Sequence, residues 1–108
     1  MAGTVTQFEV WLVTLDPTRG SEIRKTRPCA VVSPDAMNRH LRTIIVAPLT
    51  SSGKPYPSRV SCSWAGVQGM IVLDQIRTVD RSRLVKPLGT LDVDVQERVR
   101  EILAEMFE

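Results

Sequence analysis

Arg27 and Thr50 are the residues whose types and positions best suit chemistry on a phosphate group. Arg27 stands directly before Pro28, where a basic loop becomes an apolar run, so we expect an extended backbone and a rigidly held side chain. Thr50, followed by Ser51, ends another apolar run. A guanidinium can fork onto two phosphate oxygens, and a hydroxyl can donate to charge that builds in the transition state. The pair therefore suits a phosphodiester.

Among phosphodiesters, RNA needs the fewest catalytic groups from the protein, because it carries its own nucleophile. If the 2′-hydroxyl attacks the adjacent phosphate, only positioning, charge stabilisation and proton transfer are needed, without a metal or a histidine. The common templates of serine triad, HExxH helix and phosphate-binding glycine loop do not occur. Cys29, Cys62 and the single His40 form no recognisable metal set. We expect neither a metal site nor a cofactor.

Basic residues gather just before Arg27, with Glu22 among them. Arg24 and Lys25 are expected to contact phosphates, which strengthens binding without reading sequence; the alternative is a solvated loop. Glu22 can accept from a base edge or orient Arg27. A second polar loop follows Thr50, holds Ser51, Ser52, Lys54 and Tyr56, and is expected to border the RNA groove. We expect Tyr56 to pack, and the alternative is that it stacks on an unpaired base.

These residues must be positioned by short strands. Apolar and alternating runs bounded by turn residues predict five or six of them: Phe8–Leu15, Cys29–Val32, Arg42–Leu49, Arg59–Ser63, Gly69–Leu73 with Arg77–Val79 continuing it, and Lys86–Thr90. A short helical turn is predicted over Ser33–Asn38, with Ser33 as the cap. Apolar residues at three- and four-residue spacing predict a helix over Asp92–Phe107.

The predicted fold is mainly β with a C-terminal α-helix, as a small curved antiparallel sheet or SH3-like barrel. The 108 residues, 43% of them apolar, fit one domain spanning 1–108. The net charge of +2 is too small to indicate a polyanionic partner by itself. With no signal-like N-terminus or membrane-length apolar stretch, we expect a cytoplasmic protein whose two cysteines are buried and reduced.

Three blocks of the sequence resemble the MazF/PemK, or Kid-like, toxins. The first is Phe8–Glu22 followed by Thr26–Pro34, the second is Val46–Ser51, and the third is Leu73–Asp80 with Arg83 and Leu84. The resemblance implies a homodimeric SH3-like barrel that cleaves single-stranded RNA at short motifs independently of the ribosome. It also implies 2′,3′-cyclic phosphate and 5′-hydroxyl products, and a cognate antitoxin, expected to carry an acidic disordered C-terminal segment.

By the same resemblance Arg27 is the acid and phosphate clamp, and Thr50 stabilises the transition state. Asp74 falls where plasmid-borne members have a carboxylate proposed as the general base, so Asp74 and Thr50 are the candidates for that role. The sequence departs from the family in three places. Val72 replaces an arginine of the plasmid-borne members, Ser21 replaces a histidine of many relatives, and Ile23–Lys25 replaces the usual stretch rich in glutamine and glycine before Arg27.

The third block also contributes Gln75 and Arg77 as RNA-binding candidates. For Arg77 we favour a structural role over RNA contact: Arg77 and Asp80 are expected to hold the turn after the strand by mutual charge. The interface candidates are therefore Glu22, Arg24, Lys25, Ser51, Ser52, Gln75 and Arg77.

Two rival classes share the expected fold. A CcdB-like toxin binds and poisons DNA gyrase without cleaving RNA, through an apolar tail that contains tryptophan. This chain instead ends Ala104–Glu108, without tryptophan, and retains Arg27 and Thr50. A noncatalytic SH3-like binding module would be expected to cluster more exposed aromatic residues.

Overall fold

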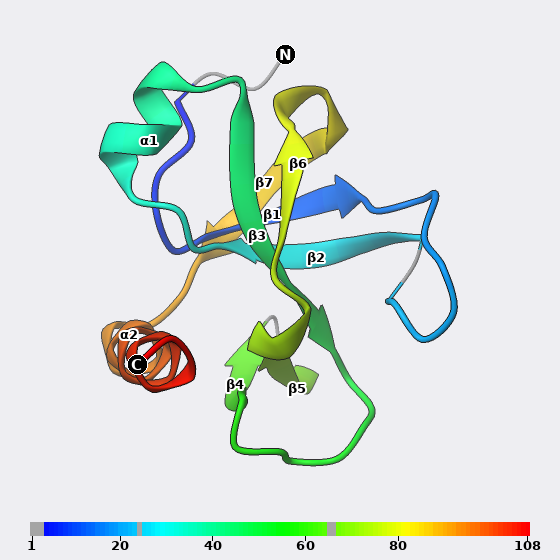
Figure 1. The fold of residues 1–108 in the computed structure, drawn as a ribbon, viewed down its shortest axis with the longest axis vertical. Helices are drawn as coiled ribbons and strands as arrows, with labels where there is room; N and C mark the ends of the chain where they lie inside the picture. Colours follow the sequence, from blue (N-terminus) through cyan, green and yellow to red (C-terminus); the bar gives the residue numbers. More distant parts are fainter. Residues whose placement is uncertain (1–3, 24, 65–66) are drawn as a thin grey trace.

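A computed structural model describes residues 4–23, 25–64 and 67–108 of the chain, as seven strands, two α-helices and two short 3-10 helices (Figure 1). The strands are β1 Glu9–Thr14, β2 Thr26–Val31, β3 Thr43–Thr50, β4 Arg59–Trp64, β5 Val67–Val72, β6 Arg77–Asp80 and β7 Leu84–Thr90. The helices are α1 Asp35–His40 and α2 Val93–Met106, and the 3-10 helices are η1 Leu73–Gln75 and η2 Arg81–Arg83. The expectation of a mainly β chain with a C-terminal helix is confirmed.

The strands form one strongly curved antiparallel sheet in the order β4-β5-β3-β2-β1-β7, and β6 also pairs with β3. β3 is long enough to serve three partners. It pairs with β6 over Thr43–Val46, with β2 over Val46–Pro48, and with β5 at Leu49 and Thr50. Pro48 has no N–H to donate, and the pairing with β2 ends there. Thr50 therefore stands where β3 passes from β2 to β5.

The prediction that Arg77–Val79 continues the strand at Gly69–Leu73 is wrong. η1 interrupts the chain at Leu73, and Ile76 N donates to the Leu73 carbonyl to close that turn. β5 pairs with β4 and with the end of β3, whereas β6 pairs with the start of β3. Apolar residues on both sides of a tight turn look like one buried run in the sequence, because periodicity does not register the change of direction.

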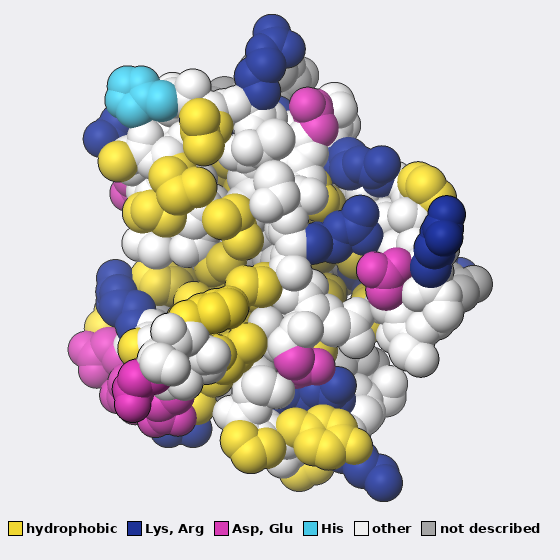
Figure 2. Space-filling view, in the orientation of Figure 1, with side chains coloured by type: hydrophobic (Ala, Val, Ile, Leu, Met, Phe, Trp, Pro, Cys, Tyr) yellow, Lys and Arg dark blue, Asp and Glu magenta, His cyan; other side chains and the backbone are white. Residues whose placement is uncertain are grey.

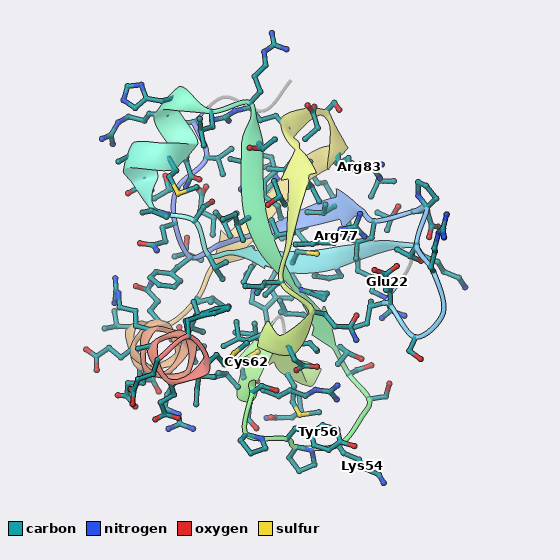
Figure 3. All side chains as sticks on the ribbon, viewed as in Figure 1. Glu22, Lys54, Tyr56, Cys62, Arg77 and Arg83 are labelled. Atoms are coloured by element: carbon teal, nitrogen blue, oxygen red, sulfur yellow. The ribbon has the colours of Figure 1, made fainter. Side chains whose placement is uncertain are left out.

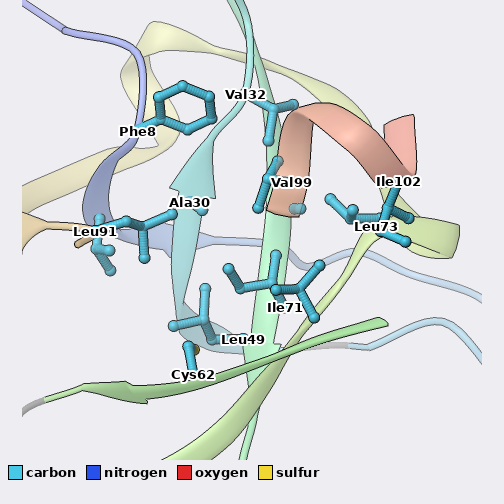
Figure 4. Packing of buried hydrophobic residues seen from close by; sticks show 13 residues of the cluster. Phe8, Ala30, Val32, Leu49, Cys62, Ile71, Leu73, Leu91, Val99 and Ile102 are labelled. Atoms are coloured by element: carbon cyan, nitrogen blue, oxygen red, sulfur yellow. The ribbon is translucent and has the colours of Figure 1, made fainter. Parts of the chain in front are cut away.

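Buried side chains form two clusters on the two faces of the sheet. Alternation along β1 sends Val10 into one cluster and Trp11 and Val13 into the other, as period-2 geometry requires. α2 covers the first cluster with Val99 and Ile102, and Figure 4 shows both pointing at the sheet. Burying each of these side chains contributes roughly 1.5–3 kcal/mol.

The predicted capping role of Ser33 is wrong, although the helical turn exists. Pro34 occupies the N-cap position of α1 and makes no side-chain cap bond. Ser33 is instead buried: its hydroxyl donates to Asn38 Oδ1 at 2.6 Å and accepts from Ile45 N at 3.1 Å. Two buried polar side chains satisfy each other here, which outweighs capping.

Both cysteines are free and buried, as expected, and Trp11 lies in the core. Among the residues that the structure describes, no helix is both long and apolar enough to cross a membrane.

Candidate active site

Arg27 and Thr50 come from neighbouring strands. The β2–β3 ladder pairs Ala30 with Ala47 and Cys29 with Pro48. Arg27 and Thr50 each lie two residues beyond the last pair of that ladder, at the point where β3 passes from β2 to β5. Both residues line one pocket of about 220 Å³. The two sequence candidates for phosphate chemistry are thus brought together.

The walls of this pocket combine a cation and hydroxyls with a mostly apolar lining. Besides Arg27 and Thr50, the lining residues are Pro28, Leu49, Ser51, Cys62, Trp64 and Gly69. Arg27 is partly buried, so its guanidinium would meet a phosphate where water screens the charge less. The pocket has the size and chemistry to hold a phosphate beside an apolar group.

Gly69 is a site residue that the sequence reasoning missed. A Cβ atom added at Gly69 would lie 2.7 Å from the Thr50 carbonyl oxygen, so β5 can approach the end of β3 only because residue 69 has no side chain. The signal in the sequence is a glycine inside a strand, which often marks a close backbone approach.

The Thr50 hydroxyl is oriented by the turn that follows it. Its Oγ1 donates to the Ser52 carbonyl at 3.0 Å and accepts from Ser52 N at 3.2 Å. Ser51 and Ser52 are themselves exposed. The two bonds hold the hydroxyl at the mouth of the pocket.

Asp74 lies in a second pocket, apart from the lining of the first. This pocket, of about 240 Å³, is lined by Leu15, Glu22, Ile23, Pro48, Asp74, Gln75, Ile76 and Arg77. It thus gathers four of the sequence candidates: Glu22, Asp74, Gln75 and Arg77. Gln75 Oε1 also accepts from Ile23 N at 2.8 Å, which ties the β1–β2 loop to η1.

The Asp74 carboxylate is paired with Arg59, a residue that the sequence reasoning did not single out. Arg59 Nε lies 3.3 Å from Oδ1 and Nη2 lies 3.4 Å from Oδ2, and the Ser58 hydroxyl donates to Oδ1 at 2.9 Å. Burial raises the pKa of Asp74, but the bonds from Arg59 and Ser58 outweigh it and leave that pKa below its usual value. The Asp74 carboxylate therefore already accepts hydrogen bonds from Arg59 and Ser58.

Arg59 also bears on the departure at Val72. In the β4–β5 ladder Arg59 is the direct partner of Val72, one of the positions at which the sequence departs from the resemblance described above. In this chain a guanidinium reaches the Asp74 carboxylate from the neighbouring strand. The approach of Arg59 to Asp74 cannot be predicted from the sequence, because it depends on the register of β4 and β5, which places residues far apart in the chain side by side.

Two arginines hold the loop that leads to Arg27. Arg77 Nη1 donates to the Leu15 carbonyl at 3.0 Å, and Arg83 Nη1 donates to the carbonyls of Thr14, at 3.2 Å, and Asp16. In Figure 3, Arg77 and Arg83 lie beside the β1–β2 loop, and Glu22 lies on the side of the loop that faces the strands.

The expected pairing of Arg77 with Asp80 is wrong. Asp80 Oδ2 accepts from Ser82 N at 2.8 Å, while Arg77 turns to Leu15. Residues three apart in a strand point to opposite faces, so the two side chains of β6 cannot meet.

The remaining loop candidates are exposed. Glu22 accepts from Arg19 N, and Lys25 N donates to Asp16 Oδ1 at 3.0 Å. Lys25 has a φ of 72°, in the left-handed region. Arg24 lies outside the described residues. Figure 2 shows Lys and Arg side chains gathered on the side of this loop, whereas acidic side chains gather over α2.

The thiols near the site are poor nucleophiles. Burial raises the pKa of Cys29 to about 12, against the opposing charges of Arg77 and Arg27. Burial also raises the pKa of Cys62. A nucleophilic cysteine needs its thiolate form, so thiol catalysis does not suit either residue.

Several known proteins are similar to this chain in sequence and in fold. The family model for PemK-like, MazF-like toxins of type II toxin-antitoxin systems matches residues 6–107. The chain is 43% identical over 105 residues to an Escherichia coli protein named endoribonuclease PemK, covering 88% of this chain and 79% of that protein.

Two solved structures from Deinococcus radiodurans match the fold. MazF has a TM-score of 0.85 at 30% identity and covers 98% of both chains. A MazE-MazF structure has a TM-score of 0.79 at 27% identity, covering 98% of this chain and 97% of the matched one. Sequence, fold and the shared pocket of Arg27 and Thr50 agree, and the chain belongs to the family of PemK-like, MazF-like toxins of type II toxin-antitoxin systems.

Proposed function

We propose that this toxin is a metal-independent endoribonuclease that cleaves single-stranded RNA at short sequence motifs, without the ribosome. The observation that carries the proposal is that Arg27 and Thr50 line one pocket. The proposal is also supported by the similarity of the chain to a protein named endoribonuclease PemK. An anion clamp and an oriented hydroxyl are what transesterification of RNA needs from a protein.

In the proposed reaction the 2′-oxygen attacks the adjacent phosphorus while the bond from phosphorus to the 5′-oxygen breaks. Arg27 forks onto the phosphate oxygens and protonates the leaving 5′-oxygen. The Thr50 hydroxyl turns its proton from the Ser52 carbonyl to the charge that builds on the phosphate. The products are a 2′,3′-cyclic phosphate and a 5′-hydroxyl. The protein supplies no nucleophile because the RNA brings its own.

The proton of the 2′-hydroxyl has two proposed acceptors, Asp74 and Thr50. Asp74→Asn separates them, because loss of the base lowers kcat several hundred-fold at unchanged KM. If Asp74 only positions Arg59, the same variant changes KM and leaves kcat within about threefold. Glu108→Gln, at an exposed carboxylate of the C-terminus, is the matched control.

The proposed RNA contacts follow from the second pocket and the two loops beside it. Glu22, Gln75 and Arg77 line that pocket, Lys25 and Arg24 belong to the basic loop, and Ser51 and Ser52 follow Thr50. Backbone contacts by the cations would give affinity, whereas Glu22 and Gln75 have the donors and acceptors that read base edges.

We further propose that the toxin is a cytoplasmic homodimer neutralised by a cognate antitoxin. The proposal is supported by the MazE-MazF structure, which resembles this chain over nearly its whole length. An acidic disordered segment of the antitoxin would be attracted to the basic loop and would cover the groove. Co-expression with the product of a short adjacent reading frame should yield a stable complex without ribonuclease activity.

The test is cleavage of a long single-stranded RNA by purified protein in EDTA, followed by analysis of the new ends. We expect discrete fragments with 2′,3′-cyclic phosphate and 5′-hydroxyl ends. Products with 3′-hydroxyl ends would mean that water attacks in place of the 2′-hydroxyl, and would contradict the proposed chemistry. Growth arrest on expression without any RNA cleavage would support the gyrase-poisoning alternative.

A further inference from the structure

Tyr56 is the only tyrosine of the chain, and it stands in the β3–β4 loop with 51% of its surface exposed. The Arg59 guanidinium carbon lies over its ring, 4.8 Å from the centroid. Arg59 thus covers one face of the ring, and half of the residue's surface is still open to solvent. An aromatic ring left open on one face and supported on the other can receive a second flat group.

The support under this ring is fixed rather than loose. Arg59 is only 15% exposed; Nε and Nη2 bond the Asp74 carboxylate, and Nη1 donates to the Lys54 carbonyl at 3.2 Å. The loop also bonds within itself, with Tyr56 N donating to Lys54 O and Arg59 N donating to Tyr56 O, both at 2.9 Å. A ring held in place before binding loses little conformational entropy when a ligand stacks on it.

The same loop begins at the proposed active site. Thr50 and Ser51 line the pocket that holds Arg27, and the chain runs from them directly to Lys54 and Tyr56. Figure 3 shows Lys54 and Tyr56 together at the outer end of this loop. An exposed cation beside an open ring suits a nucleotide, which carries a phosphate and a flat base, better than an apolar peptide.

We infer that Tyr56, backed by Arg59, is a stacking subsite for an unpaired nucleobase of the RNA, on the loop that leaves the proposed active site at Thr50. The inference rests on the proposed function and adds a specificity-determining residue to it. Every base has a flat π-face, so the subsite favours single strands over duplexes and discriminates among bases by stacking strength.

The test uses the full chain and a short single-stranded oligodeoxynucleotide that contains 2-aminopurine. This probe has no 2′-hydroxyl and is not cleaved, and its fluorescence falls when the purine stacks. Tyr56→Ala should abolish the quenching and weaken binding about 5- to 150-fold. Tyr56→Phe keeps the ring and should bind within about twofold of wild type.

Phe107→Ala is the matched control, because Phe107 is also an exposed aromatic residue, 71% exposed, but follows α2. It should leave both quenching and affinity unchanged. Unchanged binding by Tyr56→Ala would overturn the inference, as would a loss in Tyr56→Phe equal to that in Tyr56→Ala. Weakened antitoxin binding with unchanged oligonucleotide binding would also overturn it and assign the ring to a protein partner.

Failure of the inference and failure of the proposed function are distinguishable. If wild-type protein cleaves RNA and Tyr56→Ala does so with the same base preference and KM, only the subsite is wrong. If wild-type protein quenches the probe through Tyr56 but cleaves no RNA under any condition, the subsite stands and the ribonuclease proposal is wrong.

Discussion

The close approach of Gly69 to the Thr50 carbonyl oxygen shows how strictly single residues shape this site. A Cβ atom at 2.7 Å from that oxygen cannot be accommodated by a side-chain rotation, because the backbone fixes the position of the Cβ atom and the oxygen is itself a backbone atom. One of the two strands must move. The position of the Thr50 hydroxyl therefore depends on a residue that has no functional group.

We predict that Gly69→Ala lowers the free energy of unfolding by about 1–3 kcal/mol and lowers kcat/KM by a larger factor than the stability loss explains. The reason is that displacement of β3 moves Thr50 away from Arg27. Denaturant unfolding and single-turnover RNA cleavage measure the two effects. Gly20→Asn is the control: an added Cβ there meets nothing within 4 Å, and asparagine tolerates its φ of 56°. Equal activity per folded molecule would contradict this prediction.

At Asp74 the depressed pKa makes stability depend on pH. The folded value lies below the ordinary 3.8, so the stabilisation is fully present above the unfolded pKa and is lost as pH falls through the folded one. Asp74→Asn should thus be less stable than wild type at neutral pH, by under about 1 kcal/mol for a carboxylate 36% exposed. The gap should close in acid when thermal unfolding is followed against pH. A gap that widens in acid would show that the sign is wrong.

At the scale of elements, the site depends on how the β1–β2 loop is held against β6 and η1. Gln75 accepts from the backbone of that loop at Ile23, and Arg77 donates to it at Leu15. Arg83 donates to the last carbonyl of β1, at Thr14, and to the loop carbonyl of Asp16. These contacts come from segments far along the chain. They fix the loop that delivers Arg27 to β2.

We predict that Arg77→Ala destabilises the fold by about 1–3 kcal/mol and raises KM for RNA, because the Leu15 carbonyl loses its donor and the loop loosens. Arg81→Ala is a matched control: Arg81, in η2, also donates through Nε to a backbone carbonyl, that of Leu41 at 3.1 Å, but this carbonyl follows α1 and not β1. Isothermal titration with an oligodeoxynucleotide separates the two. If both variants bind equally well, Arg77 does not position the loop.

Much of this arrangement could be predicted from the sequence, and there are physical reasons why the remaining features could not. Period-2 alternation and the helical spacing of Val99 and Ile102 mark the strands and α2, because burial imposes them locally. The break at Leu73 and the buried role of Ser33 do not follow from local pattern, since tertiary contacts decide them. The Arg59–Asp74 pair depends on the β4–β5 register and is invisible before the sheet is known.

At the scale of the whole molecule, the curved sheet and α2 form the frame that keeps β3 in place. Cluster residues of α2 pack on Leu73 and Ile71, which lie on either side of the turn into η1 (Figure 4). The helix thus braces the segment from which Asp74 and Gln75 project.

We predict that Ile102→Ala costs about 2–5 kcal/mol of unfolding free energy, because it leaves a cavity between α2 and the sheet. Val93→Ala, at a side chain 68% exposed at the start of α2, should change stability by less than about 0.5 kcal/mol. Urea unfolding followed by fluorescence distinguishes the two. Similar midpoints for both variants would contradict the packing of α2 described above.

The central claim is that Arg27 and Thr50 together cleave RNA, and it is tested most directly by metal-free cleavage with single substitutions at the two residues. In EDTA, Arg27→Ala and Thr50→Ala should each lower kcat about 100- to 1,000-fold while unfolding within about 1 kcal/mol of wild type. Arg39→Ala and Thr90→Ala, at exposed positions of α1 and β7, should cleave at the wild-type rate. Cleavage by Arg27→Ala and Thr50→Ala at the wild-type rate would contradict the account.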